Sequence, residues 1–241
     1  MKPNKILIAE GKVVYWESGD LHTEFGVVKE DDLKQEVGKV MSHTGKEFVL
    51  MHASFFDKLQ KISRGPQAMM EKDIGSILAY TLPDPNAKIV EVGVGSGKLT
   101  CVLSHLFPSA EIISYEKNAE NIKLAQKNLD SFKVKNVTIK QADVLETFSE
   151  DNVDVMIMDI PDAPLALEKV APALKNGGTI VSYLPSITQV CYFVEQAEKH
   201  NILVDKVIEN LEREWHVEVR KVRPKSPGIL HTAFLVFARK L

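Results

Sequence analysis

Residues 88–97 read Lys-Ile-Val-Glu-Val-Gly-Val-Gly-Ser-Gly, and this stretch decides the fold. Its first half is a short run of Ile and Val, which is typical of a buried strand. Its second half has glycine at three alternate positions, where the main chain can turn and come close to a ligand. A helix is expected next, near residues 97–107. A strand, a glycine loop and a helix in this order predict a ligand site at the edge of a parallel sheet.

Strands and helices alternate regularly after this stretch. Apolar runs predict strands at 111–115, 137–141, 153–159, 178–184 and 202–211, and helical spacing predicts helices at 118–130, 164–174 and 187–199. A last apolar run, residues 232–238, is expected to close the sheet as an antiparallel strand. The predicted fold class is α/β: a doubly wound, Rossmann-like sheet that is mostly parallel, with one antiparallel strand.

The first 55 or so residues have a different texture. Short apolar runs such as Val13–Trp16 and Phe48–Leu50 alternate with polar turns, which indicates a small β module. The expected domains are therefore an amino-terminal β module over residues 1–57 and a larger domain over 58–241.

Composition excludes several classes of protein. The 241 residues include 30 Lys+Arg and 33 Asp+Glu, a net charge of -3, which argues against binding nucleic acid by bulk positive charge. No run approaches the roughly 18 apolar residues of a membrane span, and the start lacks the apolar core of a secretory signal. Cys101 and Cys191 lack the spacing of a metal site or a disulfide framework. We expect a cytoplasmic protein with no metal and no membrane association.

The spacing of the glycines favours S-adenosylmethionine (AdoMet) over a dinucleotide as the ligand. In the dinucleotide fingerprint GxGxxG the last glycine would fall on Lys98. The form found, GxGxG after Glu91, resembles the first motif of class I AdoMet-dependent methyltransferases. Glu116 ends the second strand, 19 residues after Gly97, where an adenosyl ribose would present its hydroxyls. Asp143 ends the third strand, where it could accept from the adenine amino group.

The fourth strand delivers Asp159 to the same edge of the sheet. Ile160 and Pro161 follow, so Asp159 lies on a stiff loop, where many methyltransferases meet the methyl acceptor. Asp159 is therefore the predicted catalytic residue. The alternative is that Asp159 only caps the next helix, although Asp162 is better placed to do so. One carboxylate alone is more typical of a helix cap or a solvated charge than of a ligand site. Three carboxylates at the ends of successive strands instead indicate a ligand site.

Longer segments resemble the TrmI-type tRNA (adenine-N1)-methyltransferases, particularly the archaeal ones, which modify a T-loop adenosine. The similar segments are 20–26, 42–48, Arg64–Gln67, 91–100, Arg223-Pro224 and 231–239. The glycine loop is shared by many methyltransferases, whereas Arg64–Gln67 and the carboxyl-terminal segments are far more specific. The chain departs from the family at Met70-Glu71-Lys72-Asp73, where members usually have Tyr/His-Pro-Lys-Asp.

The resemblance implies an AdoMet-dependent homotetramer that methylates N1 of adenosine 58 of tRNA, with adenosine 57 left open as a second target. By resemblance the AdoMet contacts are Gln67, Gly93, Gly95, Ser96, Gly97, Glu116, Asp143 and Asp159. Tyr183 ends the fifth strand and is expected to line the adenine pocket, with a packed strand aromatic as the alternative. Arg64 and His231 are expected to contact the substrate.

Basic residues supply a second reason to expect tRNA. Six of them and no acidic residue lie between Val219 and Leu241. Arg220, Lys221 and Arg223 are expected to hold phosphates, although such a run is also typical of a solvated face. A second, smaller cluster before the core of the larger domain comprises Lys58, Lys61, Arg64 and Lys72.

Three alternatives stay open. A methyltransferase acting on a small molecule or a protein carboxylate would share the glycine loop, but it would not explain the β module or the basic run. A non-catalytic tRNA-binding subunit is also known in this family, although an intact glycine loop with Glu116 and Asp159 speaks against loss of activity. A nicotinamide oxidoreductase is disfavoured by Lys98.

Overall fold

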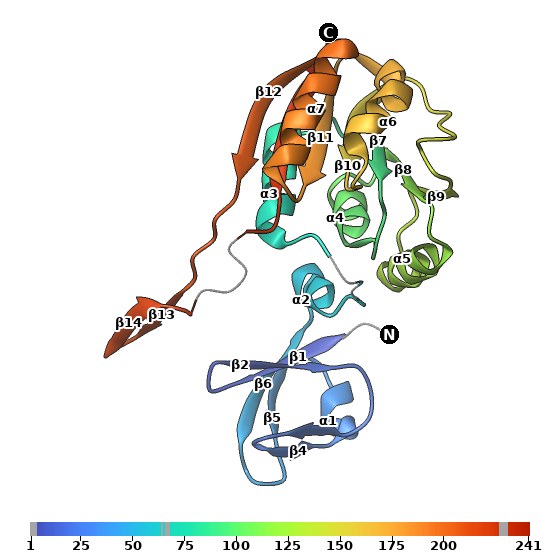
Figure 1. The fold of residues 1–241 in the computed structure, drawn as a ribbon. Coiled ribbons are helices and arrows are strands. Elements are labelled where there is room, and N and C mark those ends of the chain that lie inside the picture. Colours follow the sequence, from blue (N-terminus) through green and yellow to red (C-terminus); the bar gives the residue numbers. More distant parts are fainter. Residues whose placement is uncertain (1–3, 64, 66–67, 227–230) are drawn as a thin grey trace. The chain divides into compact units, whose positions relative to one another are not determined.

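The computed structural model describes residues 4–63, 65, 68–226 and 231–241. The chain divides into two compact units, Met1–Ser63 and Arg64–Leu241. Figure 1 shows both as ribbons, and each is described by itself below.

The first unit is built on an antiparallel sheet with the strand order β2-β1-β6-β5. Its elements are β1 (Lys5–Ala9), β2 (Lys12–Trp16), the pair β3 (Leu21–Thr23) and β4 (Gly26–Val28), α1 (Glu30–Lys34), β5 (Gly38–Met41), β6 (Glu47–His52) and α2 (Phe55–Gln60). Side chains of β6 alternate between the two faces, so that Phe48 and Leu50 are buried while Val49 is exposed. The buried set packs with Leu7, Trp16 and Leu33 into a separate core.

The second unit contains a seven-stranded sheet with the order β12-β15-β11-β10-β7-β8-β9. Its strands are β7 (Lys88–Val92), β8 (Glu111–Glu116), β9 (Val137–Gln141), β10 (Val153–Met158), β11 (Leu174–Leu184), β12 (Ile202–Glu209) and β15 (Phe234–Lys240). The pairs among β11, β10, β7, β8 and β9 are parallel, and β15 is antiparallel to both of its neighbours. The predicted fold class, with its single antiparallel strand, is confirmed.

Helices cover both faces of this sheet (Figure 1). They are α3 (Glu71–Thr81), α4 (Lys98–Leu106), α5 (Ala119–Phe132), α6 (Ala163–Val170) and α7 (Ile187–Lys199). Val92 of β7 packs in one core with Leu167 of α6 and Phe193 of α7. Its neighbour Glu91 points to the opposite face, where it accepts a hydrogen bond from Thr100 of α4. None of the helices in the described ranges is long and apolar enough to cross a membrane.

Two local predictions were wrong. The helix expected at 164–174 ends at Val170, because Pro172 follows within a short 3-10 turn (Ala171–Ala173), and β11 already begins at Leu174. The strand expected at 202–211 ends at Glu209, and a separate hairpin that was not predicted follows it. This hairpin consists of β13 (Trp215–Glu218) and β14 (Lys221–Pro224).

Candidate active site

A cavity of about 410 Å³ opens at the carboxyl ends of the central strands. The glycine loop, the ends of β8, β9 and β10 and the segment before α3 form its wall. Its lining includes Gly65, Ala68, Gly93, Gly95, Ser96, Glu116, Asn118, Asn121, Asp143, Leu145, Asp159 and Asp162. The structure therefore brings together six residues expected to contact AdoMet: Gly93, Gly95, Ser96, Glu116, Asp143 and Asp159.

Two of the loop residues, Gly93 and Gly95, have backbone conformations or neighbours that favour glycine. Gly93 has φ +94°, and a Cβ there would lie 2.3 Å from the main-chain oxygen of Asp159, so the loop packs directly on the segment after β10. Gly95 has φ +51° and open space where a Cβ would be, so the main chain itself faces the cavity. Gly97 instead lies against Ala125 of α5 and does not line the cavity; its expected contact with AdoMet stays a prediction.

Hydrogen bonds fix two carboxylates, Glu116 and Asp143, which lie at the ends of β8 and β9. Glu116 accepts hydrogen bonds from the Asn118 amide at 2.8 Å, from the Gly95 amide at 3.3 Å and from Asn121 Nδ2 at 3.2 Å. Asp143 accepts from the Leu145 amide at 3.0 Å and lies 3.4 Å from the Lys117 ammonium. These hydrogen bonds hold both carboxylates in place, and Leu145 adds an apolar wall beside Asp143.

Asp159 directly follows β10, and its amide donates to the Val92 carbonyl at 2.8 Å. Its side chain keeps some exposure to the cavity, yet burial, together with the negative charge of Glu116, raises its pKa to about 7. Burial also raises the pKa of Glu91 to about 7, although Ser114 and Thr100 donate hydrogen bonds to it. The alternative role of Asp159 as a helix cap is wrong: Asp162 is the N-cap of α6, without a side-chain capping bond.

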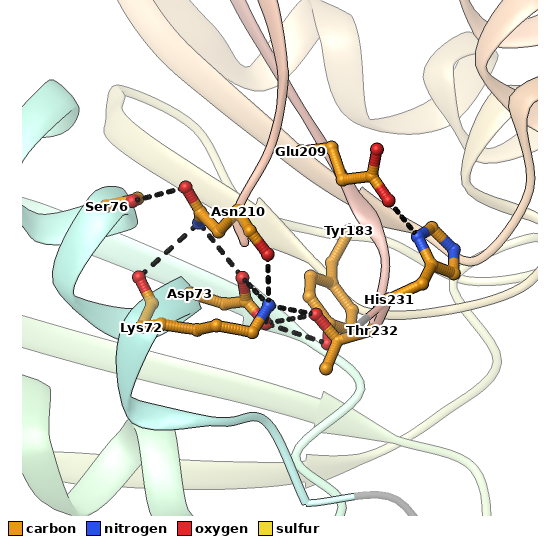
Figure 2. A network of polar contacts seen from close by, with 8 residues as sticks. All are labelled: Lys72, Asp73, Ser76, Tyr183, Glu209, Asn210, His231 and Thr232. Carbon is orange, nitrogen blue, oxygen red and sulfur yellow. Dashed lines mark hydrogen bonds and ion pairs between the residues drawn. The ribbon is translucent and has the colours of Figure 1, made fainter. Parts of the chain in front are cut away.

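The predicted substrate residues in the described part of the chain, Tyr183, Arg220, Lys221, Arg223 and His231, lie outside the lining of this cavity. The Tyr183 hydroxyl donates to Asp73 at 3.2 Å, and burial raises its pKa well above the ordinary value. His231 contacts the Pro185 carbonyl at 3.0 Å and the Glu209 carboxylate at 2.5 Å, and these two acceptors raise its pKa. Figure 2 shows Tyr183 beside Thr232, and His231 farther to the right beside Glu209. Arg220, Lys221 and Arg223 are exposed on the β13–β14 hairpin, while Arg64 and Gln67 fall outside the described residues.

Sequence reasoning missed several residues at the site. Asn118 and Asn121 line the cavity, and the position of Asn118 two residues after Glu116, before a helix, is the one signal that could have indicated the first. Lys98 is buried at the start of α4, where it donates to the Met69 carbonyl at 2.9 Å and to Glu71 at 2.8 Å. The glycine-loop pattern gave Lys98 only as the residue that replaces the last glycine of GxGxxG and did not indicate this contact.

Comparison with known proteins identifies the family. A family described as a methyltransferase domain matches residues 83–222. The tRNA (adenine(57)-N(1)/adenine(58)-N(1))-methyltransferase TrmI of Methanocaldococcus jannaschii is 32% identical, and the match covers 90% of this chain and 86% of that protein. The chain belongs to the TrmI family. The tRNA (adenine(58)-N(1))-methyltransferase TrmI of Thermus thermophilus is 31% identical over 93% of this chain and 90% of its own.

Solved structures extend the likeness to the whole TrmI fold. A tRNA (m1A58) methyltransferase TrmI from Aquifex aeolicus superposes with a TM-score of 0.81 at 27% identity, covering 100% of this chain and 98% of that one. A SAM-dependent O-methyltransferase from Thermotoga maritima superposes with a TM-score of 0.88 at 29% identity, covering 100% and 94%. Membership of the TrmI family removes the oxidoreductase alternative.

Proposed function

We propose that this protein transfers a methyl group from AdoMet to N1 of a T-loop adenosine of tRNA, at position 58. The observation that carries the proposal is the match to TrmI enzymes over at least nine-tenths of the chain. The name of the archaeal relative also includes position 57, which makes the adjacent adenosine a second candidate target. We place the activity in the cytoplasm.

The chemistry of the cavity fits AdoMet. When bound, AdoMet supplies an electrophilic methyl group on a positively charged sulfur. We assign Glu116 to accept hydrogen bonds from a pair of ribose hydroxyls, and Asp143, beside apolar Leu145, to accept from the adenine amino group; all three residues line the cavity. Gly93, Gly95, Ser96, Gly97 and Gln67 complete the proposed cofactor contacts. A cation also suits this site, because the negative charge of Glu116 raises the pKa of Asp159, and the charges of Asp159 and Glu116 raise the pKa of the buried Glu91.

Asp159 is the proposed catalytic residue. Adenine N1 already carries a lone pair, so no strong base is needed to activate it. The product ring is positively charged, and a carboxylate that accepts a hydrogen bond from the exocyclic amino group both orients the base and stabilises the growing charge. Ionised Asp159, at the end of β10 and beside the glycine loop, is placed for this role.

Binding of tRNA must offset the cost of exposing N1. A T-loop base is folded into the tRNA, and turning it out into a pocket costs roughly a few kcal/mol. The β13–β14 hairpin has two different faces, and one of them can contribute to tRNA binding. His216, Glu218, Lys221 and Arg223 share one face because they are paired at alternate positions. We assign this face and Arg220 in the turn, with Arg64, Tyr183 and His231, to tRNA.

The other face of the hairpin suits self-association. Trp215 and Val217 of β13 pair with Pro224 and Val222 of β14, and the first two are 52% and 72% exposed. A separate two-stranded sheet with an apolar face is marginal in water by itself. We propose that this face is covered in a homotetramer.

The test is methyl transfer from labelled AdoMet to an unmodified tRNA transcript, followed by digestion and mass spectrometry of the nucleosides. We expect 1-methyladenosine. Asp159→Ala should abolish its formation and weaken AdoMet binding less, whereas Asp154→Asn, at the other end of β10, should leave it intact. Label in a different nucleoside would refute the target base, and unchanged turnover of Asp159→Ala would refute the catalytic role.

O-methylation of a small molecule or a protein carboxylate is the second candidate. It is favoured by the likeness to the Thermotoga O-methyltransferase and by 26% identity to a protein-L-isoaspartate O-methyltransferase of Marinobacter nauticus over 73% of this chain. Label transfer that needs no tRNA would favour it. Tight binding of tRNA with no transfer would instead indicate a non-catalytic subunit.

A further inference from the structure

A buried polar cluster joins four separate segments of the second unit (Figure 2). Its centre is Asp73, in the first turn of α3, whose side chain is fully buried. The other members come from the end of β11 (Tyr183), from just after β12 (Asn210) and from just before β15 (Thr232). Lys72 lies beside Asp73 and its side chain is 7% exposed.

Both oxygens of the Asp73 carboxylate accept hydrogen bonds from these segments. Oδ2 accepts from the Thr232 hydroxyl at 2.7 Å and from the Tyr183 hydroxyl at 3.2 Å. Oδ1 accepts from Asn210 Nδ2 at 2.9 Å. An acid in the first turn of a helix is favoured by the helix dipole alone, but that does not explain why its oxygens are used by three distant segments.

Lys72 completes the cluster from the other side. Its ammonium lies 3.1 Å from Asp73 Oδ1 and donates to the main-chain oxygen of Asn210 at 2.9 Å and to the Thr232 hydroxyl at 2.5 Å. The Lys72–Asp73 pair therefore contacts both Asn210 and Thr232. These two residues are the start and the end of the segment that carries the β13–β14 hairpin.

We propose that Asp73 is a positioning residue that anchors both ends of the hairpin segment and fixes the Tyr183 hydroxyl, so that the tRNA-binding surface is held in register with the active site. The inference rests on the proposed function, because it takes tRNA as the substrate. It adds to that function a buried carboxylate that does not line the AdoMet cavity. A buried carboxylate is needed because only an acceptor with several lone pairs can receive donors from three segments at once.

The test compares Asp73→Asn with Asp154→Asn. Asp154 is the control: like Asp73 it pairs with a lysine ammonium, that of Lys175 at 2.6 Å, and it accepts a hydrogen bond from the Lys88 main-chain amide at 2.8 Å, but its side chain is 32% exposed and it lies at the opposite end of the sheet. In Asp73→Asn we expect KM for tRNA to rise about tenfold and kcat to fall, while the Kd of AdoMet changes less than about twofold. The control should lose stability without these kinetic changes. Equal kinetic effects in the two variants would overturn the proposal.

A double-mutant cycle tests the link to Tyr183. If Asp73 acts on kcat through the Tyr183 hydroxyl, Asp73→Asn should lower kcat much less in a Tyr183→Phe background than in the wild type. Additive effects would show that Asp73 does not position Tyr183.

Hydrogen exchange separates failure of this inference from failure of the proposed function, because it requires no substrate. In Asp73→Asn, amides on both sides of Asn210 and Thr232 should exchange faster, while those of β7 and β8 should not change. Unaltered exchange next to Asn210 and Thr232 would overturn the anchor even if tRNA is the substrate. Accelerated exchange with no methylation of tRNA by the wild type would refute the proposed function and leave the anchor standing.

Discussion

The ammonium group of Lys98 lies 2.8 Å from Oε1 of Glu71, and the Lys98 side chain is only 4% exposed. Lys98 follows the glycine loop directly, whereas Glu71 opens α3, close to the residues that close the AdoMet cavity, Gly65 and Ala68. In the family pattern a proline is usual at the position of Glu71. Here the loss of that stiff residue coincides with an ion pair that ties the α3 segment to the cofactor loop.

The two partners of this pair should respond unequally to substitution. Glu71→Ala leaves a buried cation without its carboxylate, whereas Lys98→Met leaves a carboxylate that is 38% exposed and can be hydrated. We expect Glu71→Ala to lower the free energy of unfolding by about 2–3 kcal/mol, and Lys98→Met by about 1 kcal/mol or less. Urea unfolding of the two single variants and the double variant measures this. A larger cost for Lys98→Met would contradict the argument.

The raised pKa of Asp159 makes the ligand-free protein less stable as pH rises. Its pKa is about 7 in the folded protein and near 3.8 in the unfolded chain, so ionisation favours unfolding over that range and the full penalty is present above pH 7. A shift of about three units corresponds to up to about 4 kcal/mol. Asp159→Asn should therefore stabilise the ligand-free protein at pH 8, with a gain that shrinks toward pH 4. Urea unfolding curves of the wild type and the variant at pH 8 and pH 4 measure this gain. A variant that is less stable than the wild type at pH 8 would refute the charge argument.

Binding of AdoMet should depend on the same ionisation. Ionised Asp159 attracts a cationic ligand and the protonated form does not, so the Kd should increase by up to about tenfold per unit as pH falls below 7. Calorimetry in buffers of different ionisation enthalpy should also show proton release on binding at pH 6.5. The slope should disappear in Asp159→Asn. If the variant keeps the wild-type slope, another group is responsible.

The three basic residues of the hairpin, Arg220, Lys221 and Arg223, should control the salt dependence of tRNA binding. Replacing Arg220, Lys221 and Arg223 by Gln should weaken binding and reduce the slope of log K against log salt by up to about 2–3. A matched variant removes three lysines that are each ion-paired elsewhere in the second unit, Lys123, Lys175 and Lys199. It has the same change in net charge and should keep the wild-type slope. Equal slopes in the two triple variants would exclude the hairpin from the tRNA interface.

Local patterns were sufficient for the sheet and for the cavity beside it. The run from Ile89 to Val92 is apolar on both faces apart from Glu91, as expected of a central strand, and the glycines after it fix the sharp turn. Because carboxyl ends of parallel strands meet at one edge, the order of the strands along the chain was enough to place Glu116, Asp143 and Asp159 together. The amino-terminal strands were visible from the alternation in segments such as Phe48–Leu50.

Contacts between distant segments were not predictable in this way. Asn210 and Lys72 are 138 positions apart, and nothing in either local sequence indicates the other. The β13–β14 hairpin was missed for a related reason: Trp215 and Val217 alternate with polar residues, but both are exposed and neither packs into a hydrophobic core of the described residues. The buried contacts of Lys98 were not predicted because its acceptors, in Met69 and Glu71, are remote from it in sequence.

The shared anchor at Asp73 has a consequence for how such enzymes diversify. The chain leaves the sheet after Glu209 and returns at Phe234, and Asn210 and Thr232, next to these two points, contact the same buried carboxylate. What lies between these points can vary in length and composition while the strands on either side keep their pairing. The hairpin can thus be replaced without changing the strands that carry Asp159, so in its proposed role as a tRNA contact its selectivity can change separately from the transfer chemistry.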